Sequence, residues 1–190
     1  MNEKNSSGMN SCFADLDDPL ELFKLWMAEA EKKEIDNPNA LSLATISTTN
    51  EPSVRVMLLK GLSEKGFVFY TNLNSPKSYD LKKNPKAAMC FHWKGLQRQI
   101  RISGSVAQVT DKEADDYFNS RPYESRIGAW ASDQSNVMKE RTDLLKKIEI
   151  FKRKYPTEKS VPRPKHWSGW CLNPMVIEFW LRFEYRIHER

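Results

Sequence analysis

Residues 54–77 read VRVMLLKGLSEKGFVFYTNLNSPK. This stretch contains two apolar runs, at 54–60 and 67–72, separated by the polar segment 63–66, which ends in glycine. Both runs are rich in β-branched and aromatic residues, as the strands of a sheet core are. The pattern therefore predicts a β-hairpin over these residues.

Two basic side chains, Arg55 and Lys60, interrupt the first run. A buried cation is costly unless an anion meets it. Just past the second run, hydroxyl, amide and lysine side chains gather where a helix should begin, and such a helix start can hold a phosphate group. These residues are Thr71, Asn72, Asn74, Ser75 and Lys77. The alternative is a surface hairpin whose basic side chains reach water.

Composition bounds the class of protein. The 190 residues, 39% of them hydrophobic, suffice for one domain with a substantial core, which we place at residues 17–190. Residues 1–16 are polar, and we expect them to be flexible. They contain no apolar signal-peptide core, and no apolar run in the chain is long enough to span a bilayer. We therefore expect a cytoplasmic protein with no membrane partner.

The charged, cysteine and histidine residues exclude further classes. The net charge is +5, but 30 basic residues are mixed with 25 acidic ones, and a solvated helix face explains the densest basic run, at 146–154. Small anionic ligands explain the basic bias equally well, so no nucleic-acid partner is expected. Three scattered cysteines and three histidines predict no disulfide framework and no metal site.

Hydrophobic periodicity and capping residues place the elements of the first half of the chain. Helices are predicted at 18–33 and 75–83, the first with Asp18 as its N-cap. Strands are predicted at 40–47, 87–93 and 97–109. The run at 87–93 is apolar almost throughout, which predicts a strand buried on both faces and makes His92 a core histidine rather than a catalyst. Gly104 predicts a kink in the strand at 97–109.

The second half of the chain is richer in helical patterns. A capping box at 110–113 begins a helix that ends before Pro122, and a short helical turn at 125–131 and a longer helix ending near Pro156 follow. The last strands are predicted at 175–182 and 183–190. Short strands in adjacent pairs, with helices between and after them, predict an antiparallel β-barrel with peripheral helices, of the α+β class.

Two groups of side chains suggest binding sites. Tyr117 and Arg121 share a helix face and Ser125 follows the next turn, so the three side chains suit a phosphate. The alternative is an arginine that interacts with a helix dipole. In the last predicted strand, Arg186, His188 and Arg190 alternate and so project from one face, just after Trp180. They suit an anion or a flat ring, or else protect an exposed edge strand by charge.

These residues belong to a set of motifs that resembles the pyridoxine/pyridoxamine 5′-phosphate oxidase family. The resemblance covers about residues 19–190 and rests on eight motifs in the family's order. They are RVMLLK (55–60), FYTN (69–72), S-x-K (75–77), RQ (98–99), YFNSRPxxS (117–125), GAWxSxQS (128–135), IEFW (177–180) and RIHER (186–190).

The resemblance implies a role for each matching residue. It implies that FMN is bound by Arg55, Val56, Met57, Leu58, Leu59, Lys60, Tyr70, Thr71, Lys77, Gln99, Gln134, Ser135, Trp180 and Arg190. It implies that the substrate phosphate is held by Lys60, Tyr117, Arg121 and Ser125. Arg186 and His188 correspond to the catalytic pair that packs over the pyridine ring, and Arg186 is expected to position the reacting carbon.

The resemblance also implies the fold, the assembly and the reaction. The expected fold is a split antiparallel β-barrel that binds FMN and forms a homodimer, with FMN at the subunit interface. The expected reaction is oxidation of pyridoxamine or pyridoxine 5′-phosphate by O2 to pyridoxal 5′-phosphate, releasing H2O2, and ammonia from the amine. Two alternatives stay open: a non-catalytic or weakly active protein that binds FMN or pyridoxal phosphate, and a split-barrel flavin oxidoreductase with another substrate.

Four features depart from the family pattern. Pro76 stands where relatives commonly have an arginine at the FMN phosphate, and losing one charged hydrogen bond is expected to lower FMN affinity roughly tenfold to a hundredfold. The family's Trp-Gly-Gly-x-Arg reads WSGWC at 167–171. Relatives also continue past the position of Arg190, which implies an unpaired barrel edge here, and their N-terminal substrate-covering arm has no match in residues 1–16.

Overall fold

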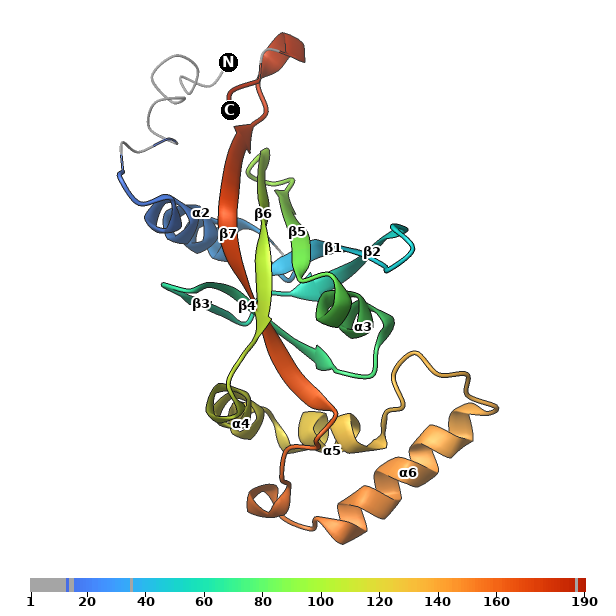
Figure 1. The fold of residues 1–190 in the computed structure, drawn as a ribbon. Helices are drawn as coiled ribbons and strands as arrows, with labels where there is room; N and C mark the ends of the chain where they lie inside the picture. The colour runs from blue at the N-terminus through green and yellow to red at the C-terminus, as the bar shows by residue number, and fades with distance from the viewer. Residues whose placement is uncertain (1–12, 14–15, 35, 187) are drawn as a thin grey trace.

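The computed structural model describes residues 13, 16–34, 36–186 and 188–190. The predicted flexible segment 1–16 lies almost wholly outside these residues. In the described part of the chain, seven strands form one antiparallel sheet in the order β2-β1-β5-β6-β7-β4-β3. The strands are β1 (Ala40–Ile46), β2 (Pro52–Leu58), β3 (Gly61–Ser63), β4 (Gly66–Asn72), β5 (Lys86–Trp93), β6 (Arg98–Gln108) and β7 (Trp167–Leu181). The sheet curls into an open half-barrel (Figure 1), which confirms the predicted barrel with peripheral helices.

The core lies in the hollow of the sheet and is covered by helix α2 (Pro19–Lys33). The helix begins as predicted, because the Asp18 carboxylate accepts a hydrogen bond from the backbone N–H of Leu20 at 2.8 Å. It buries one face, on which Phe23 packs edge-to-face against Phe67 of β4, with ring centroids 4.9 Å apart. Each such buried aromatic side chain stabilises the fold by about 1.5–3 kcal/mol.

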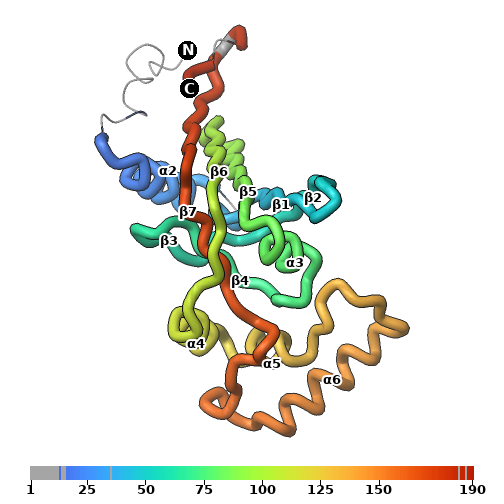
Figure 2. Tube along the Cα trace, viewed as in Figure 1, coloured from blue at the N-terminus to red at the C-terminus, as the bar shows by residue number. Residues whose placement is uncertain are grey.

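The other helices divide between two places. Helix α3 (Pro76–Lys83) follows β4 and packs on β1, whereas α4 (Asp111–Ser120), α5 (Tyr123–Ala131) and α6 (Arg141–Lys154) lie together, with the short 3₁₀ helix η1 (Glu158–Ser160), at one end of the molecule. The C-terminal segment lies at the opposite end of β7 (Figure 2). The predicted capping box at Thr110 and Glu113 is present. None of the helices in the described residues is long and apolar enough to cross a membrane.

The predicted hairpin between the runs at 54–60 and 67–72 is wrong. Strand β2 pairs with β1, whereas β4 pairs with the three-residue strand β3 across the predicted turn. Leu59 is buried between β2 and β3, and the backbone N–H of Lys60 donates to the Val68 carbonyl at 2.8 Å. The apolar run therefore bends at Leu59 and Lys60, and its first half joins the opposite end of the sheet.

Strand β5 is buried on one face only, contrary to the prediction. Ala87, Met89, Phe91 and Trp93 point into the core, whereas the residues between them point outward. His92 is one of these and is exposed, so it is not a core histidine. The outward face of β5 adjoins the outward faces of β1 and β6 in the sheet.

Strand β6 changes register at Gly104, as predicted. The pairing with β7 shifts between Ser103 and Gly104, where a side-chain Cβ on Gly104 would lie 1.9 Å from the Asn173 carbonyl oxygen. Only glycine allows the two backbones to approach so closely. The bulge helps the two longest strands to coil across the sheet.

The predicted strand at 183–190 is also wrong. Strand β7 begins at Trp167, earlier than predicted, and ends at Leu181; a 3₁₀ turn, η2 (Glu184–Arg186), and a single bridge between Leu181 and Glu189 follow. Tyr185 and Arg186 have positive φ angles of 54° and 62°. The alternation of side chains that the sequence suggested for this segment therefore does not exist.

Candidate functional site

Two cations and two threonines form a cluster between α3 and the end of the sheet. Arg55 of β2 donates from Nη1 to Thr45 Oγ1 at 2.7 Å and from Nη2 to Ser53 Oγ at 2.6 Å. Lys77, in the first turn of α3, donates to Thr71 Oγ1 of β4 at 3.1 Å. We call Arg55, Lys77, Thr45 and Thr71 the cation cluster.

The electrostatics of the cation cluster favour an anion. Lys77 is only 6% exposed, and its pKa is lowered by burial first and by the neighbouring Arg55 second. Burial also lowers the pKa of Arg55, partly opposed by the Asp80 carboxylate. Among the described residues, no carboxylate forms an ion pair with either cation. A phosphate group would supply the missing negative charge and accept hydrogen bonds from both.

Gln134 reaches the same place from the segment after α5. The backbone N–H of Asn72, next to Thr71, donates to Gln134 Oε1 at 3.4 Å. Ser135 follows with a positive φ angle of 68° and an exposed side chain. The fold therefore brings four residues predicted to bind FMN together, namely Arg55, Thr71, Lys77 and Gln134.

Three aromatic rings stack on the other side of β4. The rings of Tyr70 and Tyr117 are nearly parallel, with centroids 4.0 Å apart, and Trp167 is parallel to Tyr70 at 5.2 Å. Burial raises the pKa of Tyr70 to about 12, with smaller contributions from Tyr117 and Glu113. Tyr70 is therefore a neutral phenol at neutral pH, able to donate a hydrogen bond but not to act as a base.

Arg121 lies over this stack. Its guanidinium carbon is 4.8 Å from the centroid of Trp167, a cation–π contact, and its buried Nη1 has no hydrogen-bond partner. Burial lowers the pKa of Arg121, with Tyr117 opposing and Arg126 adding to the shift. An unpartnered buried guanidinium nitrogen suits a phosphate oxygen. Of the other residues predicted to hold the substrate phosphate, Ser125 lies half-buried in the first turn of α5, and Lys60 is exposed.

Trp167 is a residue of this site that the sequence analysis missed. It was read only as part of a divergent WSGWC motif, in a segment without a predicted strand. The structure places it at the first position of β7, where it contacts Tyr70, Tyr117 and Arg121 at once. A tryptophan just after a proline-rich loop, at the start of a strand, was the available signal.

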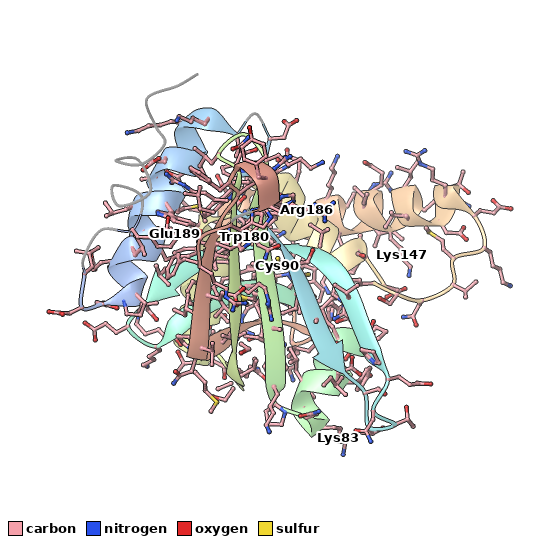
Figure 3. The ribbon with its side chains drawn as sticks, turned by 90° about the horizontal axis from the view of Figure 1, so that it is seen from above. Lys83, Cys90, Lys147, Trp180, Arg186 and Glu189 are labelled. Atoms are coloured by element: carbon pink, nitrogen blue, oxygen red, sulfur yellow. The ribbon has the colours of Figure 1, made fainter. Side chains whose placement is uncertain are left out.

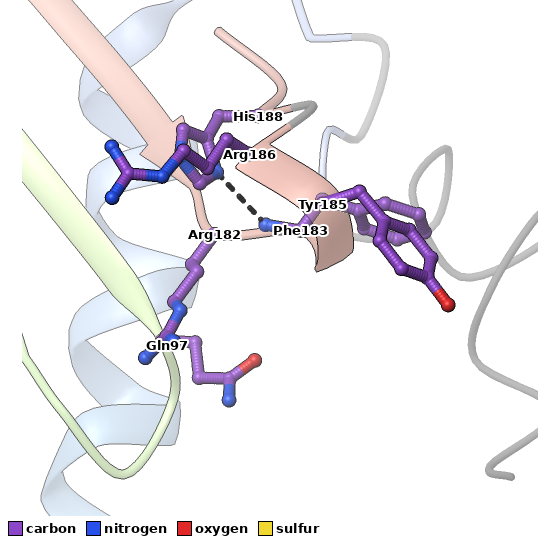
Figure 4. A pocket seen from close by; sticks show the side chains of 6 residues that line it. All are labelled: Gln97, Arg182, Phe183, Tyr185, Arg186 and His188. Atoms are coloured by element: carbon purple, nitrogen blue, oxygen red, sulfur yellow. Dashed lines mark hydrogen bonds between the residues drawn. The ribbon is translucent and has the colours of Figure 1, made fainter.

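A third group lies near the C-terminus of the chain. Gln99 of β6 pairs with Trp180 of β7, and the Trp180 ring lies 4.7 Å from the ring of His188. His188 Nδ1 accepts a hydrogen bond from the backbone N–H of Phe183 at 3.1 Å (Figure 4). Arg186 and His188 line a cavity of about 340 Å³ together with Gln97, Arg182, Phe183 and Tyr185. Trp180 and Arg186 are both labelled in Figure 3, which views the molecule from above.

Arg190 points elsewhere. Its Nη1 is 3.6 Å from Glu178, and it lines a separate hollow with Phe13 and Phe179. The run at 56–59 is also divided: Val56 is exposed on the outward face of the sheet, whereas Leu59 joins the core. The side chains predicted to contact FMN are therefore not all gathered within one chain.

The predicted site residues thus fall into two parts of the molecule. Trp167, which touches Arg121, begins β7, and Trp180, which touches His188, lies at the position before its last residue. At about 3.3 Å per residue, the two are separated by about 40 Å along the strand. The cation cluster and the aromatic stack are adjacent, because Thr71 of the cluster follows Tyr70 of the stack in β4, but the C-terminal group is remote from both.

No group of three or more histidine, cysteine or acidic side chains that could hold a metal ion is found among the described residues. The site instead offers buried cations beside parallel aromatic rings. This curled antiparallel sheet with its peripheral helices defines the chain as a split-barrel protein.

The comparisons with known proteins identify the family. The pyridoxamine 5′-phosphate oxidase family model matches residues 27–152. The chain is 60% identical over 190 residues to a pyridoxine/pyridoxamine 5′-phosphate oxidase of Pelagibacter ubique, covering all of this chain and 91% of that protein. It is 49% identical over 178 residues to the enzyme of the same name from Sinorhizobium fredii, covering 94% and 86%. The chain belongs to the pyridoxine/pyridoxamine 5′-phosphate oxidase family and is an oxidoreductase.

Two solved structures support the fold. The chain matches PhzG of Burkholderia lata, solved with tetrahydrophenazine-1-carboxylic acid, at a TM-score of 0.86 and 28% identity, covering 92% of this chain and 85% of that one. It also matches a pyridoxamine 5′-phosphate oxidase-related, FMN-binding protein of Nostoc punctiforme at a TM-score of 0.69 and 14% identity, covering 93% and 97%. The second likeness shows the split-barrel fold alone.

Proposed function

We propose that this protein oxidises pyridoxamine or pyridoxine 5′-phosphate to pyridoxal 5′-phosphate, with FMN as cofactor and O2 as the final electron acceptor. The alcohol and O2 give the aldehyde and H2O2; the amine also consumes water and releases ammonia. The observation that carries the proposal is that partly buried cations lie on either side of Tyr70 and Thr71: Arg55 and Lys77 on one side, and Arg121 on the other. Two phosphate sites close together suit a reaction between two phosphorylated ring systems.

The cation cluster is the site proposed for the FMN phosphate. Its donor set fits the group, because Arg55 and Lys77 are both cations partly or fully removed from water without an anionic partner. Gln134 and Ser135 would add polar contacts from the segment after α5, and Tyr70 and Thr71 would line the cofactor. The remaining proposed contacts are made by 56–60, Gln99, Trp180 and Arg190.

Lys60, Tyr117, Arg121 and Ser125 are the residues proposed to hold the substrate phosphate. The unpartnered Nη1 of Arg121 and the stacked phenol of Tyr117 are the features that support this assignment. FMN, when bound, would supply the two-electron redox chemistry, with O2 as the final electron acceptor. The chain supplies alignment: two phosphate clamps hold the reactants face to face.

We further propose that the site is completed by a second copy of the chain. Arg186 and His188, proposed to pack over the substrate ring, lie at the opposite end of β7 from Arg121, so one chain does not bring them together. A homodimer in which each C-terminal group meets the partner's cation cluster would do so. The outward face of the sheet supports this assembly, because Val54, Val56 and Val176 are 68%, 70% and 60% exposed there.

The test is oxygen-dependent formation of pyridoxal phosphate from pyridoxamine phosphate by the full chain, with FMN in excess and H2O2 measured alongside. Replacing Arg186 by alanine should lower kcat/KM roughly a hundredfold, because the reacting carbon loses its alignment. Arg153→Ala, at an exposed position of α6, is the matched control and should retain activity. A folded, FMN-loaded wild type without turnover would overturn the proposed reaction. Full activity of the Arg186→Ala variant would overturn only the role of that residue.

Two alternatives give different results in the same experiment. A binding protein would take up FMN or pyridoxal phosphate without turnover. A flavin oxidoreductase with another substrate would bind FMN but show no preference for phosphorylated B6 vitamers. The unpartnered nitrogen of Arg121 favours the phosphorylated substrate.

A further inference from the structure

Thr45 connects two charged side chains of opposite sign inside the protein. It lies on β1, is fully buried, and its Oγ1 is 2.7 Å from Arg55 Nη1 and 2.7 Å from Asp80 Oδ2. A guanidinium can only donate, so the Thr45 oxygen accepts from Arg55 and its single proton is donated to Asp80. The chemistry of the three groups therefore fixes the direction of both hydrogen bonds.

These two hydrogen bonds link the strand that carries Arg55 to the helix that carries Lys77. Asp80 and Lys77 are three residues apart on α3 and so lie on neighbouring positions of one helix face. Arg55 is on β2, which pairs with β1 so that Leu43 lies opposite Arg55 and Ser53 opposite Thr45. The bonds from Asp80 to Thr45 and from Thr45 to Arg55 thus hold α3, with Lys77, in a set position relative to Arg55.

We propose that Thr45 is a positioning residue for the cofactor phosphate: its hydroxyl stands between Asp80 and Arg55, aims the guanidinium at the anion site, and keeps the carboxylate from pairing with it directly. This inference rests on the proposed function, since the anion is taken to be the phosphate of FMN. Without the hydroxyl, Arg55 Nη1 and Asp80 each lose a partner, and pairing with one another satisfies both. Arg55 would then form an ion pair with Asp80, which leaves less of its charge for the anion, while its bonds to the Leu43 carbonyl and to Ser53 remain available.

The experiment compares FMN and riboflavin binding, followed by quenching of flavin fluorescence, in the full-length apoprotein. Thr45→Val has nearly the shape of threonine but no hydroxyl, and should weaken FMN binding about tenfold. Riboflavin has no phosphate, so its affinity should not change. Thr45→Ser keeps the hydroxyl and should bind FMN as the wild type does. Thr49→Val, which removes an exposed hydroxyl from the β1–β2 turn, controls for the substitution itself.

A double-mutant cycle separates positioning from general loosening. In an Arg55→Met background, Thr45→Val should leave the remaining FMN affinity unchanged, because the hydroxyl acts through Arg55. If thermal unfolding shows that Thr45→Val does not fold, Thr45→Ala takes its place in every measurement, because alanine also lacks the hydroxyl and adds no bulk.

Three results would overturn the inference. Unchanged FMN affinity in both hydroxyl-free variants would do so, as would equal losses for FMN and riboflavin, or an undiminished effect of Thr45→Val in the Arg55→Met background. Each of these leaves the proposed function standing if wild-type protein binds FMN and turns over. A wild type that binds neither flavin would overturn the proposed cofactor and the inference together.

Discussion

Lys77 is a buried cation without an ion-pair partner among the described residues, and its burial lowers the stability of the ligand-free protein. The fold removes its ammonium group from water and sets Arg55 near it, so the pKa of Lys77 is lowered from its ordinary value of 10.5. Between the lowered pKa and 10.5 the unfolded chain binds more protons than the folded one. The contribution of Lys77 to stability therefore rises with pH in that window. An anion that pairs with the ammonium reverses this penalty.

The pH dependence of FMN binding should report this residue. Phosphate interacts with the ammonium and not with the neutral amine, so FMN affinity should be constant while Lys77 is protonated and fall as the pH rises through its lowered pKa. Fluorescence titrations of the apoprotein from about pH 7 to about pH 10 would measure this. In Lys77→Arg the cation does not titrate in this range, so the alkaline decrease should shrink. An equal decrease in both proteins would show that Lys77 is not the group responsible.

The aromatic stack and Arg121 show a second use of burial at the residue scale. Trp167 offers its face to the guanidinium and leaves Arg121 Nη1 without a protein partner. A cation–π contact can hold an arginine without using its N–H donors. The N–H donors of Arg121 therefore stay available to a ligand. An ion pair with a carboxylate would occupy them.

At the scale of elements, helix α3 carries the departure from the family pattern that matters most for the cofactor. Pro76 occupies its first turn, beside Lys77 and after the N-cap Ser75, and its side chain is exposed. A proline is well tolerated at this position because its missing N–H would have no partner within the helix. It supplies no charge, however, where the resemblance implies an arginine.

Pro76→Arg should therefore tighten FMN binding roughly tenfold, by adding one charged hydrogen bond near the helix N-terminus. The gain should disappear for riboflavin and shrink at high salt, since the new arginine is exposed. Pro76→Ala removes the proline without adding charge and serves as the control. If Pro76→Ala and Pro76→Arg bind FMN equally, the position does not contact the phosphate.

The sequence predicted some features of the helices and strands correctly and others wrongly. Local signals succeeded: the Asp18 cap, the Thr110 capping box and the Gly104 kink depend on neighbours in the chain or on a single residue type. The predicted strand pairing was wrong, because the run at 54–60 is as suited to β1 as to β4. Its bend at Leu59 has no local signature in the sequence. The face alternation of β5 was hidden, because its outward residues include Ala88 and Cys90, apolar like its core.

Four of the residues that the resemblance assigns to FMN lie together in the fold. Arg55, Thr71, Lys77 and Gln134 come together although the hairpin that was to carry two of them does not exist. Matching motifs identify residues without requiring their contacts. What the motifs did not reveal was Trp167, whose role comes from its place under Arg121. The contacts of Arg186, His188 and Arg190 followed from neither periodicity nor motifs, since the chain turns at Glu184–Arg186 instead of extending.

For the whole molecule, the unusual feature is the outward face of the half-barrel. Across β2, β1, β5, β6 and β7 it presents valine, alanine, serine and cysteine side chains, interrupted by the ion pair between Arg101 and Glu178 at 3.2 Å. Exposed valines gathered on one face in this way are typical of an interaction site. A second copy explains it together with the divided site residues, whereas an unrelated partner would explain only the surface.

A charge placed on this face should therefore separate the subunits of the proposed homodimer and weaken FMN binding at the same time. Val176→Asp puts a carboxylate at a position that is 60% exposed in the single chain, and we expect a monomer, because an unpaired charge buried at an interface is strongly unfavourable.

Ile150→Asp is the matched control: Ile150 is also 60% exposed but lies on α6, away from this face. Light scattering after gel filtration would give the oligomeric state, and flavin fluorescence the FMN affinity. The control should remain a dimer with wild-type affinity, whereas Val176→Asp should lose both, since the partner's Gln99 and Trp180 are proposed to reach the flavin. A Val176→Asp protein that is monomeric yet binds FMN as the wild type does would place the whole cofactor site within one chain, and one that remains dimeric would move the interface to another face.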